Sequence, residues 1–178
     1  QSVPSGGAPS VFGTIPGYPK GSQFSNRASV KAAGLHRHLR AGISGNPDEG
    51  ADAIVVSGGY HDDRDEGDRI LYTGQGGQQG RRQVEDQTLT KGNLGLVNSE
   101  RSGLPVRVIR GWEAGGPHAP ASGYRYDGLF TVVRHYVEPS SDGPLIYRFE
   151  LQQADEAEGV QWDISKVGFQ SQQLPSGN

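Results

Sequence analysis

The densest group of chemically active side chains lies in residues 58–68, which read GGYHDDRDEGD, between two expected strands. Shortly after it, residues 71–77 read LYTGQGG. Together the two segments supply two tyrosines, several carboxylates, a threonine and glycine-rich backbone. Two aromatic rings can sandwich a planar base, a carboxylate can accept a hydrogen bond from the exocyclic amine of cytosine, and glycines let the backbone approach the base edge. This set of side chains is typical of a nucleobase pocket.

Other chemistries fit the acidic segment less well. The spacing Asp63-x-Asp65 fits the start of an EF-hand calcium loop. The rest does not fit, because the glycine expected at the sixth position comes one residue early, at Gly67, and the twelfth position, which should be Glu, is Gly74. A pair of carboxylates from residues 62–68 for hydrolysis stays open, since the sequence does not place two of them about 5–10 Å apart across a cleft. The alternative is that the segment has no binding or catalytic function and is a solvated acidic loop beside two tyrosines of the hydrophobic core.

The remaining motifs do not complete a catalytic or metal site. His36 and His38 have the spacing of a metal-ligand pair, but no third ligand cluster accompanies them. The sequence contains no G-x-S-x-G nucleophile motif, and no Gly-Lys-Ser/Thr completes a P-loop. We therefore expect no catalytic residue, no metal and no cofactor in this chain. Trp112 and Trp162 are expected to be packing residues.

A strand is expected to carry Tyr72, and strands are expected on both sides of the acidic segment that contains Tyr60. β-branched and aromatic residues favour strands when glycine or charge flanks them. Within residues 145–151, Arg148 and Glu150 alternate with apolar residues, so the two charged side chains should face the opposite side. Strands are expected over residues 53–56, 69–73, 106–110, 129–137 and 145–151.

Two helices are expected beside these strands. Ser25 can cap a helix over residues 25–33, which Gly34 would end. Residues 86–98 favour a second helix with its apolar residues on one side, although two glycines inside it lower the propensity. Residues 75–80 form a loop rich in Gln and Gly. The expected fold class is α+β, with a strongly curved, barrel-like sheet and a few flanking helices.

Length, composition and charge favour one polar domain with a basic region. The chain has 178 residues, 33% of them hydrophobic, and it has no Cys and no Met. No apolar run approaches the roughly 18 residues of a membrane span, and the missing Met suggests a fragment of a longer protein. The net charge is −3, but no acid precedes Asp48, and a local basic field can bind phosphate. The basic residues before Asp48 are Lys20, Arg27, Lys31, Arg37 and Arg40.

Seven short motifs, in one order, give the chain its resemblance to a known family. The chain resembles the SRA domain (SET and RING finger-associated), also called the YDG domain, over residues 11–152. Its name-giving tripeptide stands at residues 126–128. The motifs are FGxIPG at 12–17, GLHR leading to AGIxG at 34–45, GGYxDD at 58–63, YTGxGG at 72–77, DQ at 86–87, PVRVIR at 105–110 and YDGLF at 126–130.

The resemblance implies a domain that binds duplex DNA and swings a modified cytosine into a pocket in the concave face of a bent sheet. On the matching positions, Tyr60 and Tyr72 would stack on the two faces of the base. Asp63 would accept from its amine, while Thr73 and Gly74 would meet the other edge of the pyrimidine.

The resemblance also implies which residues contact the methyl group and which loop fills the gap that the flipped base leaves in the duplex. Ser57, Gly58 and Gly59 would lie near the methyl group, whose burial is worth about 1 kcal/mol. The loop that fills the duplex would be residues 39–43, with Arg40 and Ala41 at the insertion. Arg40 is the candidate for the inserted side chain, and a phosphate contact or a solvated arginine is the alternative.

A second loop, residues 75–85, departs from the family's animal members, which carry a longer finger there. Gln75, Arg81 and Arg82 remain as candidate DNA contacts, and the shorter loop puts a strict preference for hemimethylated sites in doubt. Further candidates for phosphate contact are Lys20, Arg27, Lys31, Arg37 and Arg110.

The function expected from the sequence is binding of double-stranded DNA that carries 5-methylcytosine or 5-hydroxymethylcytosine. The chain would be the non-enzymatic recognition domain of a bacterial SRA-HNH type modification-dependent restriction endonuclease, with the nuclease domain elsewhere in the full-length chain. The alternatives are a chromatin-type methyl-CpG reader and a hydrolase that uses the acidic loop. The expected location is the bacterial cytoplasm at the nucleoid, or the nucleus in a eukaryote. The expected boundaries are a flexible lead-in over 1–10, the DNA-binding domain over 11–152, and a tail or linker over 153–178.

Overall fold

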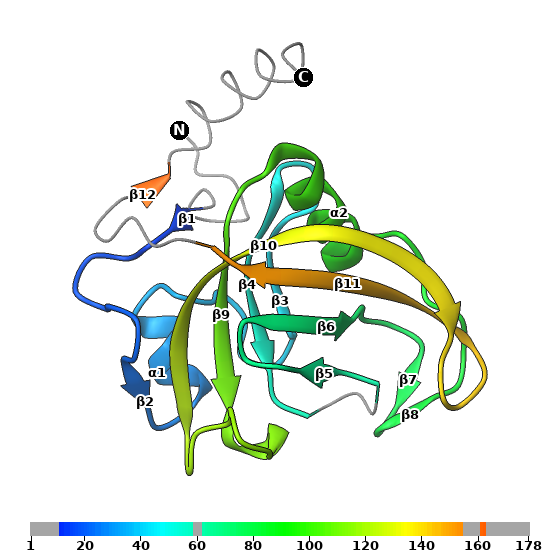
Figure 1. Ribbon diagram of the computed structural model, residues 1–178, viewed down its shortest axis with the longest axis horizontal. Helices are drawn as coiled ribbons and strands as arrows, with labels where there is room; N and C mark the ends of the chain where they lie inside the picture. The colour runs from blue at the N-terminus through cyan, green and yellow to red at the C-terminus, as the bar shows by residue number, and fades with distance from the viewer. Residues whose placement is uncertain (1–10, 59–61, 155–160, 163–178) are drawn as a thin grey trace.

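The computed structural model describes residues 11–58, 62–154 and 161–162 (Figure 1). None of the helices in these ranges is long and apolar enough to cross a membrane. In chain order the elements are β1 (Phe12–Gly13), β2 (Gln23–Phe24), α1 (Arg27–Ala32), β3 (Ile43–Asn46), β4 (Gly50–Val56), β5 (Arg64–Asp65), β6 (Arg69–Thr73), β7 (Gln78–Gln79), β8 (Arg82–Gln83), α2 (Lys91–Ser102), β9 (Val106–Gly111), the 3-10 helix η1 (Trp112–Ala114), β10 (Tyr124–Pro139), β11 (Leu145–Gln153) and β12 (Gln161–Trp162).

One curved sheet of eight strands forms the body of the molecule (Figure 1). Its strand order is β3-β4-β9-β10-β11-β6-β5, and β2 pairs with the first residues of β10. The β4–β9 pair is parallel and the other pairs in this sheet are antiparallel. Because β3 and β5 lie at its two edges, the sheet is curved but does not close into a barrel. The expected α+β class with a strongly curved sheet is confirmed.

The curvature centres on β10, a strand of 16 residues that pairs with β9 in its first half and β11 in its second. Its register shifts twice, between Tyr126 and Leu129 and between Val132 and Arg134. Such irregularities bend a strand and increase its twist. Gly128, the last residue of the YDG tripeptide, lies at the first shift with a φ of 96°, which glycine adopts without steric strain.

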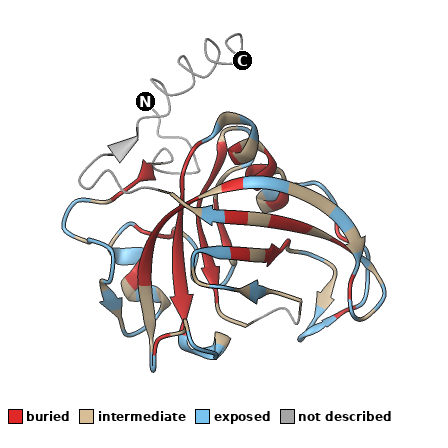
Figure 2. Cartoon of the chain, viewed as in Figure 1, coloured by how far each residue is buried: buried red, intermediate tan, exposed pale blue. Residues whose placement is uncertain are grey.

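The hydrophobic core lies on both faces of the central strands, as Figure 2 shows by the continuous burial of β4 and β9. Along β4, Ile54 and Val56 join the larger cluster with α2, whereas Ala53 and Val55 join a smaller cluster with Val30 of α1. This alternation explains why residues 53–56 read as an unbroken apolar run, since both faces of the strand are covered.

The first helix starts two residues later than expected. Asn26 caps α1, and its Oδ1 accepts a hydrogen bond of 2.8 Å from the backbone N–H of Ser29. The proposed cap at Ser25 is therefore wrong by one residue. Asn and Ser serve this position about equally well, so the sequence alone gave no basis for choosing between them.

The second helix, α2, spans Lys91–Ser102 instead of residues 86–98. The segment before it is extended, because Asp86 accepts from the N–H of Leu145 and the N–H of Gln87 donates to the carbonyl of Leu145. The helix contains Gly92 and Gly95 for a packing reason. A Cβ on Gly95 would lie 3.3 Å from the backbone of Ala51, so the glycine lets α2 approach β4 closely.

The two tryptophans do not share the expected packing role. Trp112 lies in η1 and is 51% exposed, so the expectation that it packs in the core is wrong. The side chain of Trp162 lies outside the described residues.

Candidate nucleic-acid interface

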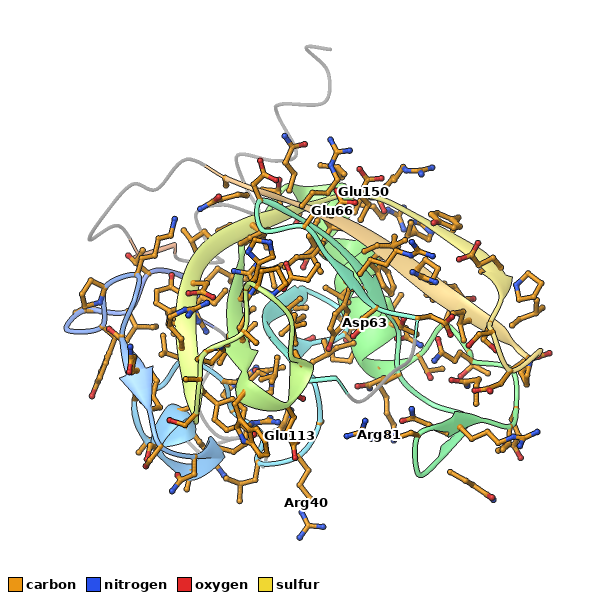
Figure 3. The ribbon with its side chains drawn as sticks, turned by 60° about the horizontal axis from the view of Figure 1, so that its bottom comes forward. Arg40, Asp63, Glu66, Arg81, Glu113 and Glu150 are labelled. Carbon is orange, nitrogen blue, oxygen red and sulfur yellow. The ribbon has the colours of Figure 1, made fainter. Side chains whose placement is uncertain are left out.

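Asp63 is the central polar group of the candidate site. It stands just before β5, and its Oδ1 accepts a hydrogen bond of 2.7 Å from the backbone N–H of Thr73, the last residue of β6. Asp63 lines two cavities, one of about 230 Å³ and one of about 340 Å³. Figure 3 shows Asp63 near the middle of the molecule, with Arg40 and Arg81 toward the lower edge of the view. The carboxylate is thus fixed on one side and faces open space on the other.

The environment of Asp63 raises the pKa of its carboxyl group. Burial raises the pKa of its carboxyl from 3.8 to about 6, mainly by desolvation, and Asp62 adds to the increase. The hydrogen bonds from Thr73 and the charge of Arg148 oppose the shift. At neutral pH the group is still mostly ionised, and it is therefore a hydrogen-bond acceptor inside a partly apolar cavity.

Tyr72 and Ser57 line the cavity of about 230 Å³ together with Asp63. Tyr72 is buried, and its hydroxyl donates to the carbonyl of Val55 at 3.2 Å, which fixes the ring against β4. Gly58 lines the other cavity. Its φ is 79°, and a Cβ there would lie 2.7 Å from the carbonyl oxygen of Glu113, so a larger residue would not fit. Residues 59–61, which include Gly59 and Tyr60, lie outside the described residues.

Arg148 anchors the acidic segment from β11. It is only 4% exposed, donates to the carbonyl of Asp62 at 2.6 Å and pairs with Glu138 at 3.0 Å. Arg148 and Glu150 lie two residues apart on β11, and Arg148 is the one of the two that is buried. The carboxylate of Asp62 accepts from Ser141 in the β10–β11 turn at 3.3 Å. Asp62 thus ties the loop to the sheet.

Asp65 belongs to an internal ion-pair network. Arg110 donates to its two carboxylate oxygens at 2.7 and 2.8 Å and to Asp127 at 3.0 Å. Asp127, the acid of the YDG tripeptide, is also held by Arg125. Because Arg110 is 6% exposed and bonded inside the protein, its geometry does not favour a phosphate contact. The same pairing occupies Asp65, which weakens a hydrolase built on the acidic loop.

Gly74 and Gln75 are positioned by two side chains that the sequence did not single out as site residues. Gln87 donates to the carbonyl of Gly74 at 2.7 Å, and Asn93 of α2 both accepts from and donates to the backbone of Gln75 at 2.8 and 2.9 Å. A Cβ on Gly74 would lie 2.6 Å from Asn93 Oδ1. Gln87 belongs to the DQ motif, which was the one signal for it; nothing in the sequence marked Asn93.

The loop of residues 37–42 is held by Arg27 and His36. Arg27 Nη2 donates to the carbonyls of His38 at 2.8 Å and Ala41 at 2.7 Å, and His36 Nε2 bonds the carbonyl of Gly42 at 3.1 Å. Two donors, Arg27 Nη2 and the N–H of His38, lie 3.3 Å from Nδ1, and this arrangement favours the tautomer with its proton on Nε2. Burial, reinforced by Arg27, lowers the pKa of His36 to about 3, so the ring stays neutral. Arg27 therefore supports the loop from inside.

The exposed part of this loop carries the candidate insertion residues. Arg40 and Ala41 are exposed, and both line the cavity of about 230 Å³. Arg40 extends away from the body of the protein in Figure 3. Lys20 and Lys31 are exposed as well, whereas Arg37 is half-buried and pairs with Asp52 at 3.4 Å.

The second loop forms a short hairpin in which β7 pairs with β8. Gln83 anchors it, because its side chain donates to the carbonyls of Gly76 and Glu85 at 2.8 Å and its backbone N–H donates to Asp142 at 2.9 Å. Arg81 and Arg82 are exposed. Arg81 also lines the larger cavity with Asp63, so the hairpin borders the same site.

Among residues 11–58 and 62–154, no group of three or more His, Cys, Asp or Glu side chains is arranged to hold a metal ion. The candidate site combines the carboxylate of Asp63 with aromatic surface, small residues and two arginine-bearing loops. That arrangement can bind a planar polar group, with positive charge at the rim.

The comparisons with known proteins identify the family of the chain. The family model for the SAD/SRA domain matches residues 11–157. The E3 ubiquitin-protein ligase UHRF1 of Rattus norvegicus is 38% identical over 173 residues, which are 85% of this chain and 22% of that protein. The chain thus spans less than a quarter of that relative.

Two solved structures are similar over most of the chain. The modification dependent TagI restriction endonuclease has a TM-score of 0.79 and 50% identity, covering 90% of this chain and 56% of that one. The SUVH5 SRA domain bound to fully hydroxymethylated CG DNA has a TM-score of 0.71 and 38% identity, covering 85% of this chain and 99% of that one. The motif-based resemblance is confirmed: the chain belongs to the SAD/SRA domain family.

Proposed function

We propose that this chain binds double-stranded DNA containing modified cytosine and holds the flipped base in the cavity lined by Asp63 and Tyr72. The observation that carries the proposal is the carboxylate of Asp63, fixed by the N–H of Thr73 and facing a cavity of about 230 Å³. An ionised acceptor beside an aromatic ring suits the exocyclic amine and the flat face of cytosine. The chain is a reader and performs no catalysis of its own.

The pocket would divide the recognition of the base among few groups. Asp63 would accept from the amine and Tyr72 would contact one face, while the other face is assigned to Tyr60 from the family resemblance alone, since Tyr60 lies outside the described residues. Ser57 and Gly58 are small and leave room for a methyl or hydroxymethyl group. Thr73 and Gly74 serve the pocket through their backbone, since the N–H of Thr73 holds Asp63 and Gly74 is packed against Asn93.

Residues at the rim of the pocket would fill the gap in the opened duplex and contact its phosphates. Flipping costs a few kcal/mol of stacking and pairing, so the gap must be filled. Arg40 is placed for this because its loop is exposed while its carbonyls are fixed from inside. Arg27 and Arg110 are left out of the phosphate contacts, since their guanidinium groups bond within the protein. The remaining candidates for the phosphates and base edges are Lys20, Lys31, Gln75, Arg81 and Arg82. Arg37 is a weaker candidate, because it is half-buried and pairs with Asp52.

The full-length protein is proposed to be a modification-dependent restriction endonuclease. The similarity to TagI supports this, since its identity of 50% and coverage of 90% exceed the 38% and 85% of UHRF1. A nuclease domain would then lie elsewhere in the protein, which would act on DNA in a bacterial cytoplasm at the nucleoid. The alternative is a chromatin-type methyl-CpG reader in a nucleus, which the similarity to UHRF1 and SUVH5 favours.

A competition titration at fixed salt tests the proposal. One duplex is prepared with its central cytosine unmodified, methylated on one or both strands, or hydroxymethylated, and a neighbouring 2-aminopurine reports unstacking. Modified duplexes should bind at least about tenfold more tightly, equivalent to about 1.4 kcal/mol, with increased 2-aminopurine emission. Tyr60→Ala and Asp63→Ala should abolish the difference. Equal binding of all duplexes would refute the pocket.

A further inference from the structure

Trp112 is an exposed aromatic residue that the proposed pocket does not use. It begins the short helix η1 directly after β9, and half of its surface, 51%, is accessible. Single exposed apolar side chains are common on protein surfaces, so exposure by itself carries no meaning. The position of η1 relative to the pocket is what gives Trp112 significance.

The helix η1 forms a wall of the proposed site. Glu113 and Ala114 line the cavity of about 340 Å³ that Asp63 and Arg81 also line. The carbonyl of Glu113 lies so close to Gly58 that a Cβ there would clash at 2.7 Å. Figure 3 shows Glu113 on the same side of the molecule as Arg40 and Arg81. The segment therefore borders the surface that a duplex must approach.

The backbone around Trp112 is fixed. Its N–H donates to the carbonyl of Gly123 at 2.9 Å, and its carbonyl accepts from the N–H of Gly115 at 3.2 Å. The far end of the segment is tied down where Arg125 donates to the carbonyl of His118 at 2.5 Å. A ring presented from a rigid backbone loses less entropy on contact than one on a flexible loop.

The charge of the segment indicates which part of DNA it can touch. The acidic residue of η1 is Glu113, which is exposed, and phosphates repel a carboxylate. A large aromatic ring gains most from the flat faces of bases and from sugars. We propose that η1 is a third DNA-contacting element, in which Trp112 packs on the sugar and base surface beside the flipped nucleotide. This inference rests on the proposed function.

The fluorescence of Trp112 tests the contact directly. The chain has two tryptophans, so Trp162→Phe leaves Trp112 as the only one. Titration of this variant with methylated duplex should shift or quench its emission, and the change should saturate together with the anisotropy of the labelled DNA. Saturation of the anisotropy with unchanged emission would overturn the inference, while the proposed function would stand.

The affinity of Trp112 variants supplies a second test. Trp112→Ala should bind methylated duplex about tenfold more weakly, and Trp112→Phe should recover most of the loss. The plot of log affinity against log salt should keep its slope, because no phosphate contact is removed. Val133→Ala, at an exposed apolar position of β10, is the control and should bind like the wild type.

The two failures can be told apart. Wild-type affinity for Trp112→Ala, with preference for the modified duplex intact, overturns the inference alone. A wild-type chain that shows no preference for modified duplex overturns the proposed function on which it rests. A reduced salt slope for Trp112→Ala also contradicts the inference, since it would place the segment against phosphates.

Discussion

The arginines of the sheet and the arginines of the loops differ in what they bind. Arg107, Arg110 and Arg148 are nearly inaccessible, and each donates to carboxylates or carbonyls of the protein. Arg40 and Arg81 are exposed at the rim of the candidate pocket. The comparison separates a structural task of arginine from the DNA contact that we propose for the exposed set. The sheet arginines fix the segments that shape the site, and the loop arginines remain available to DNA.

The buried set illustrates why arginine suits the first task. Arg107 donates to the carbonyls of Val11, Gly13 and Leu35 at 2.8–2.9 Å and lies 3.7 Å from Asp52. One planar guanidinium thereby joins the start of the domain to the segment that leads into the Arg40 loop. A desolvated charge persists only when such partners are present, so the sheet arginines should be sensitive to loss of any one of them.

The largest expected effect is on stability, at Arg110. Arg110→Ala leaves the poorly solvated carboxylate of Asp65 without its ion-pair partner and removes one of the two arginines that hold Asp127, which should lower the free energy of unfolding by about 3–5 kcal/mol. Urea unfolding followed by circular dichroism measures the change. The molecules that remain folded should still prefer methylated duplex.

The matched control is Arg69→Ala, which removes an exposed ion pair with Glu150. Exposed pairs contribute about 0–1 kcal/mol, so this variant should stay near the wild type. If Arg110→Ala keeps the stability of the wild type but loses affinity for all duplexes, Arg110 belongs with the DNA-contacting arginines instead.

The next effect is on selectivity, at Asp63. Asp63→Asn keeps an oxygen for the N–H of Thr73 but loses the carboxylate, so preference for modified duplex should fall by about 1–3 kcal/mol. In the wild type the same preference should weaken as pH drops below about 6, where the carboxyl of Asp63 becomes protonated. Competition binding at pH 7.5 and 5.5 measures the preference of the variant and the pH dependence of the wild type. Unchanged selectivity in the variant would remove Asp63 from base recognition.

Replacing Asp63 should also affect stability. The change should stabilise the protein, whereas Arg110→Ala should destabilise it. The pKa of Asp63 is raised in the folded state, so its favourable contribution is complete below pH 3.8 and is lost as pH rises through about 6. The free protein should lose about 3 kcal/mol across this window. Asp63→Asn should lack this loss and be more stable than the wild type at pH 8. A less stable variant would contradict the desolvation of Asp63.

The sequence allowed prediction of the strands around the pocket better than of the supports beneath it. Residues 69–73 form β6 as expected, and 53–56 lie within β4, because runs of β-branched residues specify a strand locally. The structure also brings Asp63 and Tyr72 to one cavity. By contrast, the burial of Arg148 depends on Asp62, 86 positions away, and no local pattern encodes such a contact.

The start of α2 shows the same limit. The sequence favours a helix from residue 86, but Asp86 and Gln87 bond the backbone of β11 about 60 residues later, and the helix begins only at Lys91. Tertiary hydrogen bonds here override a local propensity of a few tenths of a kcal/mol per residue. Asn93, which orients Gln75, is likewise visible only once α2 has been placed.

A smaller effect is expected at Arg40 and separates its two roles. Arg40→Ala should weaken binding of modified duplex about tenfold, because a bidentate bond to an orphan guanine is worth about 1–3 kcal/mol. Arg40→Lys decides between insertion and a phosphate contact. Lysine keeps the charge but not the planar fork, so an inserted arginine predicts that Lys behaves like Ala. Near wild-type affinity for Arg40→Lys would assign Arg40 to a phosphate.

The smallest effects are expected in the second loop, at Arg81 and Arg82. Each change to alanine should weaken binding of every duplex about threefold and reduce the salt slope by about 0.9, as for one phosphate contact. Gln79→Ala, in the same hairpin, is the uncharged control and should leave the slope unchanged.

Arg81 also lines the cavity with Asp63, so Arg81→Ala tests the role of the hairpin more sharply than Arg82→Ala does. If Arg81→Ala changes the ratio of hemimethylated to fully methylated binding and leaves the salt slope unchanged, then this short hairpin reads the opposite strand. Arg81 would then move from the phosphate-contacting arginines to the base-reading residues, although its loop is shorter than the family's finger.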